Sequence, residues 1–311
     1  MKDPKIFTLF WSNLEAYEDC PQKFLWGRGW HDIDLGRGLG RAMKKPEKDS
    51  EHHRLMGTVI QSVIEDMYNQ EIWRDTANIK DRLRGLLDKK FALELSKAYI
   101  DWRRSDCPTS SEMHGICWDG IIGYLKTMKH HRLLGPYARA EVEIPAWVNK
   151  YTPINGKADV IIRRDDTGVT ILDGKNSKSK GKYTDPDQLR WYALCFYLAY
   201  NKIPDRLGFV YYRYPYGKPI VDDEGNPTGE TETGIDWVPC TKDDIKGLAQ
   251  RAADARKGMD FHKFEPKPSP DVCRLCDFET VCEARKATKR QVRKKPSALE
   301  DLLKDGGIVE F

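Results

Sequence analysis

Apolar residues follow a helical period through most of the first half of the chain. From Leu55 onward they recur at the spacing that one face of an α-helix requires. Helical sequence continues to about residue 131. A shorter helix is predicted over residues 11–20, and Pro21 is expected to end it because proline interrupts helices. The first half is therefore predicted to be mostly α-helical, with an apolar stripe made by Val59, Ile60, Val63, Ile64 and Met67.

The pattern changes to short β-rich runs after residue 136. Turn-forming Pro, Asn, Gly and Asp residues separate three such runs, and a helical period returns over residues 187–201 before a further strand. Another helix is expected near residues 241–258. The order strand, strand, strand, helix, strand predicts an α/β protein with a mixed β-sheet core flanked by helices. The predicted strands cover residues 140–148, 156–164, 168–175 and 206–215.

Composition and charge restrict the class of protein without deciding it. The 311 residues, 40% of them hydrophobic, can bury one substantial core with appended segments. Lys and Arg total 52 against 48 Asp and Glu, and the net charge of +4 provides no overall field for a polyanion, so any nucleic-acid contact must rest on local charge. Because the sequence has no long apolar run and no secretory signal pattern, we expect a cytoplasmic protein without a membrane partner.

Two acidic residues and a lysine on the second and third predicted strands are the main candidates for catalysis. Asp159 lies near the start of one strand, and Asp173-Gly174-Lys175 closes the next. A hairpin would bring these strands together, and Asp173 and Lys175 would point to the same face because strand side chains alternate. Two carboxylates suit Mg²⁺ or Mn²⁺, and a nearby lysine can orient an attacking water and stabilise negative charge. For the triplet alone, a solvated strand end with a salt bridge is the commoner explanation.

The order of four motifs resembles the RecB/AddB-type branch of the PD-(D/E)XK nuclease superfamily, including its CRISPR-associated and phage exonuclease members. The motifs are the helix GTVIQSVIE, the strand GKADVI, the strand ILDGK and the helix QLRWY. The resemblance implies a restriction-endonuclease-like fold in which Asp159 and Asp173 bind metal. It also implies that Gln188 and Tyr192 help to position DNA and Lys175.

The first motif departs from the family pattern at one position. The family commonly has His where this chain has Gln61, whose amide oxygen is a neutral and weaker ligand. Other branches of the superfamily accept Gln or Glu at the corresponding place, so the resemblance makes Gln61 a further candidate metal ligand. An ordinary polar position on a helix surface is the alternative explanation.

Three of the eight cysteines form a compact set typical of metal ligation. Cys273, Cys276 and Cys282 are closely spaced, and thiols in a reducing cytoplasm rarely form disulfides. Cys20, in the sequence SNLEAYEDCPQKF, matches an N-terminal signature of the same family, whose cysteine joins a C-terminal triplet to hold a [4Fe-4S] cluster. The resemblance therefore implies an iron-sulfur staple, with tetrahedral zinc or cysteines without metal as alternatives. Core packing explains the remaining cysteines, Cys107, Cys117, Cys195 and Cys240.

Basic and aromatic residues near the candidate site offer contacts for DNA. Lys178, Lys180 and Lys182 follow the D-x-K strand in a loop that can track a phosphate backbone, although a simple solvated loop also explains them. The strand sequence FVYYRYPYG offers either aromatic stacking for a single strand or ordinary strand packing. His52 and His53 are predicted to be an exposed loop pair rather than metal ligands.

The predicted function is that of a metal-dependent DNA nuclease. We expect an exonuclease that acts on single-stranded or free-ended DNA in recombination, repair, phage DNA metabolism or CRISPR adaptation. The alternatives are a catalytically weak or inactive DNA-binding adaptor of the same fold and a zinc-stapled DNA-binding protein. The basic tail is expected to be flexible, with a short acidic-apolar end that docks on a replication or recombination protein. The predicted segments are an N-terminal segment with the first cluster cysteine (1–50), a helical region (51–135), the nuclease core (136–262), the C-terminal cysteine cluster (263–285) and the tail (286–311).

Overall fold

The structure is a computed structural model that describes residues 7–28, 50–166, 168–181, 184–214, 216–217, 219–274, 276–279 and 281–285. The chain divides into two compact units, Met1–Trp11 with Glu47–Ala253 and Ser12–Pro46 with Asp254–Phe311. The first unit contains the central sheet, and the second contains Cys20 and the C-terminal cysteines. Lys182 and the predicted tail lie outside the described residues.

Three long helices of the first unit form one layer, as the helical period predicted. They are α4 (His52–Asn69), α5 (Ile79–Lys97) and α6 (Ser110–His130), with the short 3₁₀ helix η1 (Ile72–Arg74) after α4. The predicted apolar stripe of α4 is buried. The start of α6 is fixed by a capping box, in which Thr109 Oγ1 accepts from the Glu112 backbone N–H and the Glu112 carboxylate accepts from the Thr109 backbone N–H.

The central sheet has five strands in the order β1-β2-β3-β4-β7. β1, β2 and β3 form an antiparallel meander, β3 pairs parallel with β4, and β4 pairs antiparallel with β7. The parallel pair requires a crossover, and α7 (Pro186–Tyr200) supplies it. The predicted mixed α/β architecture and the order of its elements are therefore confirmed. The strands are β1 (Ala138–Asn149), β2 (Thr152–Arg164), β3 (Gly168–Lys175), β4 (Arg206–Tyr211) and β7 (Ile235–Val238).

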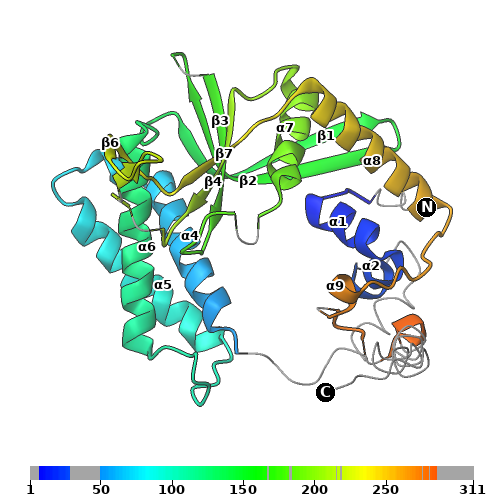
Figure 1. Ribbon diagram of the computed structural model, residues 1–311, viewed down its shortest axis with the longest axis horizontal. Coiled ribbons are helices and arrows are strands. Elements are labelled where there is room, and N and C mark those ends of the chain that lie inside the picture. Colours follow the sequence, from blue (N-terminus) through cyan, green and yellow to red (C-terminus); the bar gives the residue numbers. More distant parts are fainter. Residues whose placement is uncertain are drawn as a thin grey trace, which may run out of the picture. The chain divides into compact units, whose positions relative to one another are not determined.

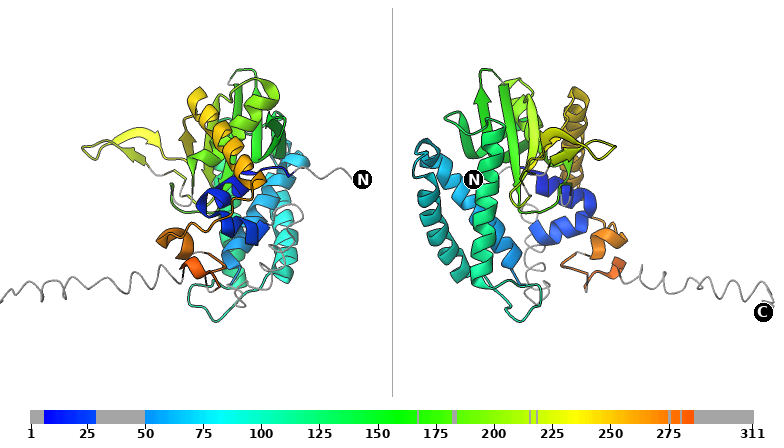
Figure 2. Two further views of the ribbon diagram at one scale, coloured as in Figure 1. Left: turned by 90° about the vertical axis from the view of Figure 1, so that its right-hand side faces the viewer. Right: turned by 60° about the vertical axis from the view of Figure 1, so that its left-hand side comes forward.

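Helices cover both faces of this sheet (Figures 1 and 2). On one face, Val160 and Ile162 of β2 belong to the apolar cluster built by α4, α5 and α6. On the other face, Gly156 of β2 lies under α7, where an added Cβ would be 3.1 Å from Tyr192 and 3.3 Å from the sulfur of Cys195. Strands covered on both sides carry near-continuous apolar sequence, which accounts for the runs in β2 and β3.

Two elements follow β4 before the end of the first unit. The polar insert forms a separate hairpin of β5 (Pro219–Val221) and β6 (Pro227–Thr231). The helix predicted near residues 241–258 is α8 (Lys242–Asp260), which begins in the first unit and ends in the second. None of the described helices is both long enough and apolar enough to span a membrane.

The second unit joins the predicted opening helix to the C-terminal cysteine segment. It contains α1 (Trp11–Asp19) from its second residue onward, α2 (Pro21–Arg28) and α9 (Pro270–Arg274). The prediction that Pro21 merely ends a helix was incomplete, because Pro21 also begins α2. Proline fits the first helical turn, whose N–H groups have no partner within the helix. Tyr17 donates a hydrogen bond to the backbone oxygen of Lys263 at 2.9 Å and connects the two segments of this unit.

Candidate active site

Asp159, Asp173 and Lys175 come together where β2 and β3 lie side by side. β2 and β3 are antiparallel and pair through Val160 and Leu172. Asp159, just before Val160, and Asp173, just after Leu172, therefore lie on the same side of this pair. The backbone N–H of Gly174 donates to Asp159 Oδ2 at 2.7 Å. Lys175 Nζ lies 2.7 Å from Asp173 Oδ2 as an ion pair, because the two side chains share one face of β3. The hairpin therefore produces the cluster that the sequence predicted.

Side chains of α7 hold Asp173 and Lys175 from one side of the sheet. Gln188 accepts from Lys175 Nζ at 2.8 Å and donates through Nε2 to Asp173 Oδ1 at 2.9 Å. Tyr192, one turn further along α7, donates to the same Asp173 oxygen at 3.3 Å and accepts from Gln188 at 3.0 Å. This network restrains both the acid and the amine of the D-x-K triplet.

Gln61 of α4 holds Asp159 from the other side of the sheet. Its Nε2 donates to Asp159 Oδ1 at 3.0 Å and to Glu141 Oε1 at 2.7 Å. Lys157 also forms an ion pair with Glu141. The amide nitrogen of Gln61, rather than its oxygen, therefore faces the two carboxylates in this structure.

Glu141 is a site residue that the sequence did not single out. The β1–β2 ladder pairs Ala140 with Val160 and Val142 with Ala158, but no pair joins Glu141 to Asp159 between them. Glu141 has a φ of +53°, in the left-handed region that non-glycine residues rarely adopt. Such strained residues concentrate at functional sites. A charged residue inside the predicted strand AEVEIPAWV was the only sequence signal available.

Burial makes the carboxylates of this cluster hard to ionise together. Burial, followed by the nearby Asp173 charge, raises the pKa of Asp159 to about 8. Burial also raises the pKa of Asp173, although Lys175 partly opposes the shift. Asp173 Oδ2 is buried without a hydrogen bond, so the Lys175 ion pair is its charged contact among the described residues. Converging buried carboxylate oxygens form a donor set that fits Mg²⁺ or Mn²⁺.

A family model described as the PD-(D/E)XK nuclease superfamily matches residues 10–283. The chain belongs to the PD-(D/E)XK nuclease superfamily. Membership indicates a nuclease, and the five-stranded mixed sheet between helices is consistent with the restriction-endonuclease-like fold expected of this superfamily.

Other comparisons add little to the superfamily assignment. No curated protein matches the chain. A solved structure titled "Crystal structure of SSO0001" is similar at 20% sequence identity and a TM-score of 0.32, covering 56% of this chain and 78% of that one. The superfamily assignment rests on the family model alone.

Gly174 is the residue between the acid and the lysine of the D-x-K triplet. A Cβ at this position would lie 1.6 Å from the hydroxyl oxygen of Tyr212, which is buried against the α4 layer. Asp173 and Lys175 point to one face of the sheet, so Gly174 faces the other. A glycine is therefore required for Tyr212 to pack across β3.

A cavity of about 330 Å³ lies beside the D-x-K strand. Tyr212 connects the two, because its backbone N–H donates to the Lys175 backbone oxygen at 3.0 Å. Burial lowers the pKa of Arg213, and no acidic side chain among the described residues pairs with it. Lys180 Nζ lies 4.9 Å from the ring centre of Tyr214. The cavity is lined by Ile116, Asp119, Ile122, Gly123, Lys126, Lys178, Tyr212, Arg213, Tyr214 and Tyr216.

The four candidate cluster cysteines line one cavity within the second unit. Gln22, Lys23, Trp26 and Phe278 line it with them. The backbone N–H of Lys267 donates to Cys20 Sγ at 3.4 Å. Burial raises the pKa of Cys276, and the nearby Cys20 and Cys273 raise it further. Four converging thiols with an N–H donor form a set that suits a thiolate-bound metal centre. They are Cys20, Cys273, Cys276 and Cys282.

The expectation for His52 and His53 was wrong in two respects. Both residues lie in the first turn of α4 rather than in a loop. His52 is only 1% exposed, whereas His53 is exposed as expected. The helical period starts earlier than the apolar stripe, so sequence periodicity alone did not place these two residues.

Proposed function

We propose that this chain is a metal-dependent deoxyribonuclease whose active site contains Asp159, Asp173 and Lys175. The network that joins these residues to Gln188, Gln61 and Glu141 is the observation that carries the proposal. Six sequence-predicted residues, from four separate elements, meet in this network. They are Gln61, Asp159, Asp173, Lys175, Gln188 and Tyr192.

Asp159 and Asp173 would hold the Mg²⁺ or Mn²⁺ that superfamily members usually use. When bound, such an ion polarises the phosphodiester and lowers the pKa of a bound water. Gln188 and Tyr192 engage Oδ1 of Asp173, so Oδ2, which is ion-paired with Lys175, is the oxygen that would bind the metal. Lys175, held by Gln188, is placed to orient the attacking water and to stabilise negative charge on the phosphoryl group.

We assign Gln61 a positioning role and Glu141 a place beside the metal site. Gln61 donates to Asp159 and Glu141 and thus keeps two negative groups close together. An amide flipped by half a turn would present its oxygen to the acids instead. Gln61 as a metal ligand requires that flipped orientation.

The cavity beside the D-x-K strand is the proposed path of the DNA strand. Its basic residues offer phosphate contacts, and Tyr214 and Tyr216 offer surfaces for base stacking. No acidic side chain of the described residues pairs with the Arg213 guanidinium, which is therefore available to a phosphate. We propose that this path receives single-stranded or unwound ends and that the enzyme acts as an exonuclease at free ends.

The four cysteines of the second unit are proposed to hold a [4Fe-4S] cluster. Their shared cavity supports a single metal centre, and the sequence signature around Cys20 favours iron-sulfur over zinc. When bound, the cluster would fix the N-terminal helices to the C-terminal segment. The cysteine motif supports the proposal that the chain belongs to the RecB/AddB-like branch and acts in recombination, repair, phage DNA metabolism or CRISPR adaptation in the cytoplasm.

The tail outside the described residues is proposed to recruit a recombination or replication protein. Its basic run is followed by the short acidic-apolar end GGIVEF. Deleting residues 297–311 is expected to abolish co-purification with that protein and to leave hydrolysis of free DNA unchanged. Co-purification that survives the deletion would contradict this role.

The nuclease proposal is tested with labelled single-stranded and duplex DNA. Wild-type protein is expected to degrade DNA with Mg²⁺ or Mn²⁺ and to stop when EDTA is added. Asp173→Asn is expected to lose activity by roughly two orders of magnitude or more, because it removes a charged ligand. Asp243→Asn, in a residue of α8 whose side chain is 94% exposed, is the matched control and is expected to keep full activity.

An inactive DNA-binding adaptor is the second candidate. The observation that favours it is Gln61, which presents an amide nitrogen to the acids where relatives commonly have His. The adaptor predicts DNA binding with no metal-dependent cleavage in the wild type. The same assay therefore distinguishes the two functions.

A further inference from the structure

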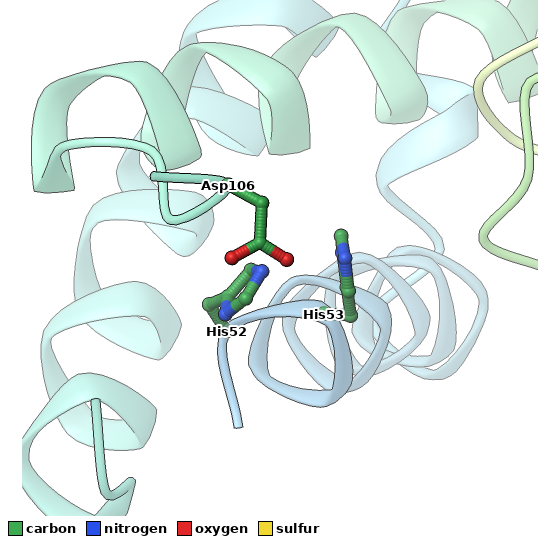
Figure 3. Close-up of side chains that lie close together, drawn as sticks. All are labelled: His52, His53 and Asp106. Atoms are coloured by element: carbon green, nitrogen blue, oxygen red, sulfur yellow. The ribbon is translucent and has the colours of Figure 1, made fainter. Parts of the chain in front are cut away.

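A second group of ligand-type side chains lies at the start of α4. One ring nitrogen each of His52 and His53 and one carboxylate oxygen of Asp106 lie within 4.8 Å of one another. Figure 3 shows the two imidazole rings next to the Asp106 carboxylate. The group is separated from Gln61 by about 13 Å along the helix, at 1.5 Å per residue. It is therefore distinct from the proposed catalytic centre.

His52 has a buried nitrogen that nothing in the described chain satisfies. The residue is 1% exposed, and its Nδ1 lies 3.0 Å from Ser50 Oγ. Its Nε2 is buried without a hydrogen-bond partner. Leaving such an atom unpaired is costly, and native structures generally give it a partner. A histidine that donates one nitrogen to an oxygen and offers the other is the usual state of a metal ligand.

Arg104 holds the Asp106 carboxylate in place beside the two imidazoles. It donates to both oxygens of Asp106 at 2.9 Å. Each carboxylate oxygen keeps a further lone pair for a metal.

We propose that His52, His53 and Asp106 form a Zn²⁺ site that is separate from the nuclease centre. Two imidazoles and one carboxylate match the donors that zinc accepts, and a water would complete the tetrahedron. Imidazole donors favour zinc over Mg²⁺, which prefers oxygen. Zinc–nitrogen bonds of about 2.0–2.1 Å require the three groups to draw together, and the exposed His53 and Asp106 side chains have room to do so.

The site would fasten the start of α4 to the segment before α6. Three hydrogen bonds already join these segments. Glu51 N–H donates to the Tyr99 oxygen at 2.9 Å, Tyr99 N–H donates to Glu51 Oε2 at 3.0 Å, and Asp101 N–H donates to Ser50 Oγ at 3.2 Å. Asp106 lies on this same segment, so its coordination would add a cross-link between the two regions. Zinc binding should therefore stabilise the folded chain by mass action.

The test measures bound Zn²⁺ per chain in the full-length protein and three variants. His53→Ala and Asp106→Asn replace exposed ligands, so both are expected to fold. His114→Ala is the matched control because His114 also lies beside a carboxylate, with Nε2 2.8 Å from Asp88, but no third ligand completes that pair in the described chain. Each variant is equilibrated with Zn²⁺ and a competing chelator, and its metal content and melting temperature are recorded with and without Zn²⁺.

We expect His53→Ala and Asp106→Asn to bind about one equivalent of zinc less than the wild type and His114→Ala. Zinc ions held by the cysteines or by the nuclease acids are present in all four proteins, so they do not affect the difference in zinc content between variants. The wild type should also show a larger zinc-induced rise in melting temperature than either ligand variant. Equal zinc content and equal thermal shifts in all four proteins would overturn the proposal, and so would an equal loss in His114→Ala.

Discussion

At the residue scale, two glutamines hold the acids of the proposed active site. Gln61 donates to Asp159 from α4, and Gln188 donates to Asp173 from α7. Buried carboxylates resist ionisation, and amide N–H donors only partly compensate for lost water. The site therefore favours a bound proton or a bound cation over bare charges.

The raised pKa of Asp159 predicts a pH-dependent metal affinity. Below about pH 8 this carboxyl is neutral in the metal-free protein, so Mn²⁺ must displace a proton to bind. The folded chain holds this proton where the unfolded chain has released it, so the stability contributed by the group falls from about pH 4 to about pH 8. Calorimetry in buffers of different ionisation enthalpy should show Mn²⁺ affinity and proton release that vary up to about pH 8. An affinity that does not change over that interval would contradict the assignment.

The sequence revealed the acids of this site but not all of their partners. Asp173 and Lys175 were predictable because alternate residues of a strand share a face. Glu141 was not, because its left-handed backbone and its contact with Gln61 depend on how β1 bends against α4. The buried nitrogen of His52 could not be predicted either, because its burial arises from packing that no local sequence pattern encodes.

At the element scale, β3 serves as the bridge between the two helical layers. Asp173 and Lys175 contact Gln188 of α7, while Gly174 leaves room for Tyr212 on the opposite face. The order of strands and the crossover helix were predictable from turn residues and from the change of apolar period. The unpaired position of Glu141 in the β1–β2 ladder was not predictable, because it depends on how the two strands pair with each other.

Gly174→Ala should disrupt the packing of this bridge. The new Cβ would lie 1.6 Å from the Tyr212 hydroxyl oxygen, so β3 or Tyr212 must move. Overpacking of this kind costs about 1–3 kcal/mol, and we expect a matching loss in the free energy of unfolding measured with urea, together with reduced nuclease activity. Gly85→Ala is the control: an added Cβ in α5 meets nothing within 4 Å, so it should leave stability unchanged or raise it. An equal effect of both substitutions would count against the packing explanation.

At the scale of the whole molecule, the proposed catalytic and metal-binding residues lie in a few places on a chain whose positive and negative charges nearly balance. The net charge of +4 gives no general attraction for DNA, so the proposed DNA binding would depend on local groups such as Lys178 and Arg213. Cys20 lies far in sequence from Cys273, Cys276 and Cys282, and yet all four line one cavity of the second unit. The sequence signature around Cys20 predicted that the four cysteines lie together, whereas their spacing along the chain did not.

A [4Fe-4S] cluster predicts a brown protein when it is purified without oxygen. Cys276→Ser should lose the broad visible absorbance and the bound iron, because a thiolate ligand is removed. Cys240→Ser is the control, since Cys240 does not line the cluster cavity. A colourless wild type that contains stoichiometric zinc would instead support the tetrahedral zinc alternative.

The central claim is most directly tested by Lys175→Ala, with metal binding and DNA cleavage measured on the same preparation. Lys175 contacts Asp173 and Gln188 but is not a proposed ligand, so Mn²⁺ binding should persist. Cleavage should fall by roughly 10²-fold or more, because the group that orients water and stabilises charge is gone. Cleavage at the wild-type rate with Mn²⁺ bound would contradict the proposed active site.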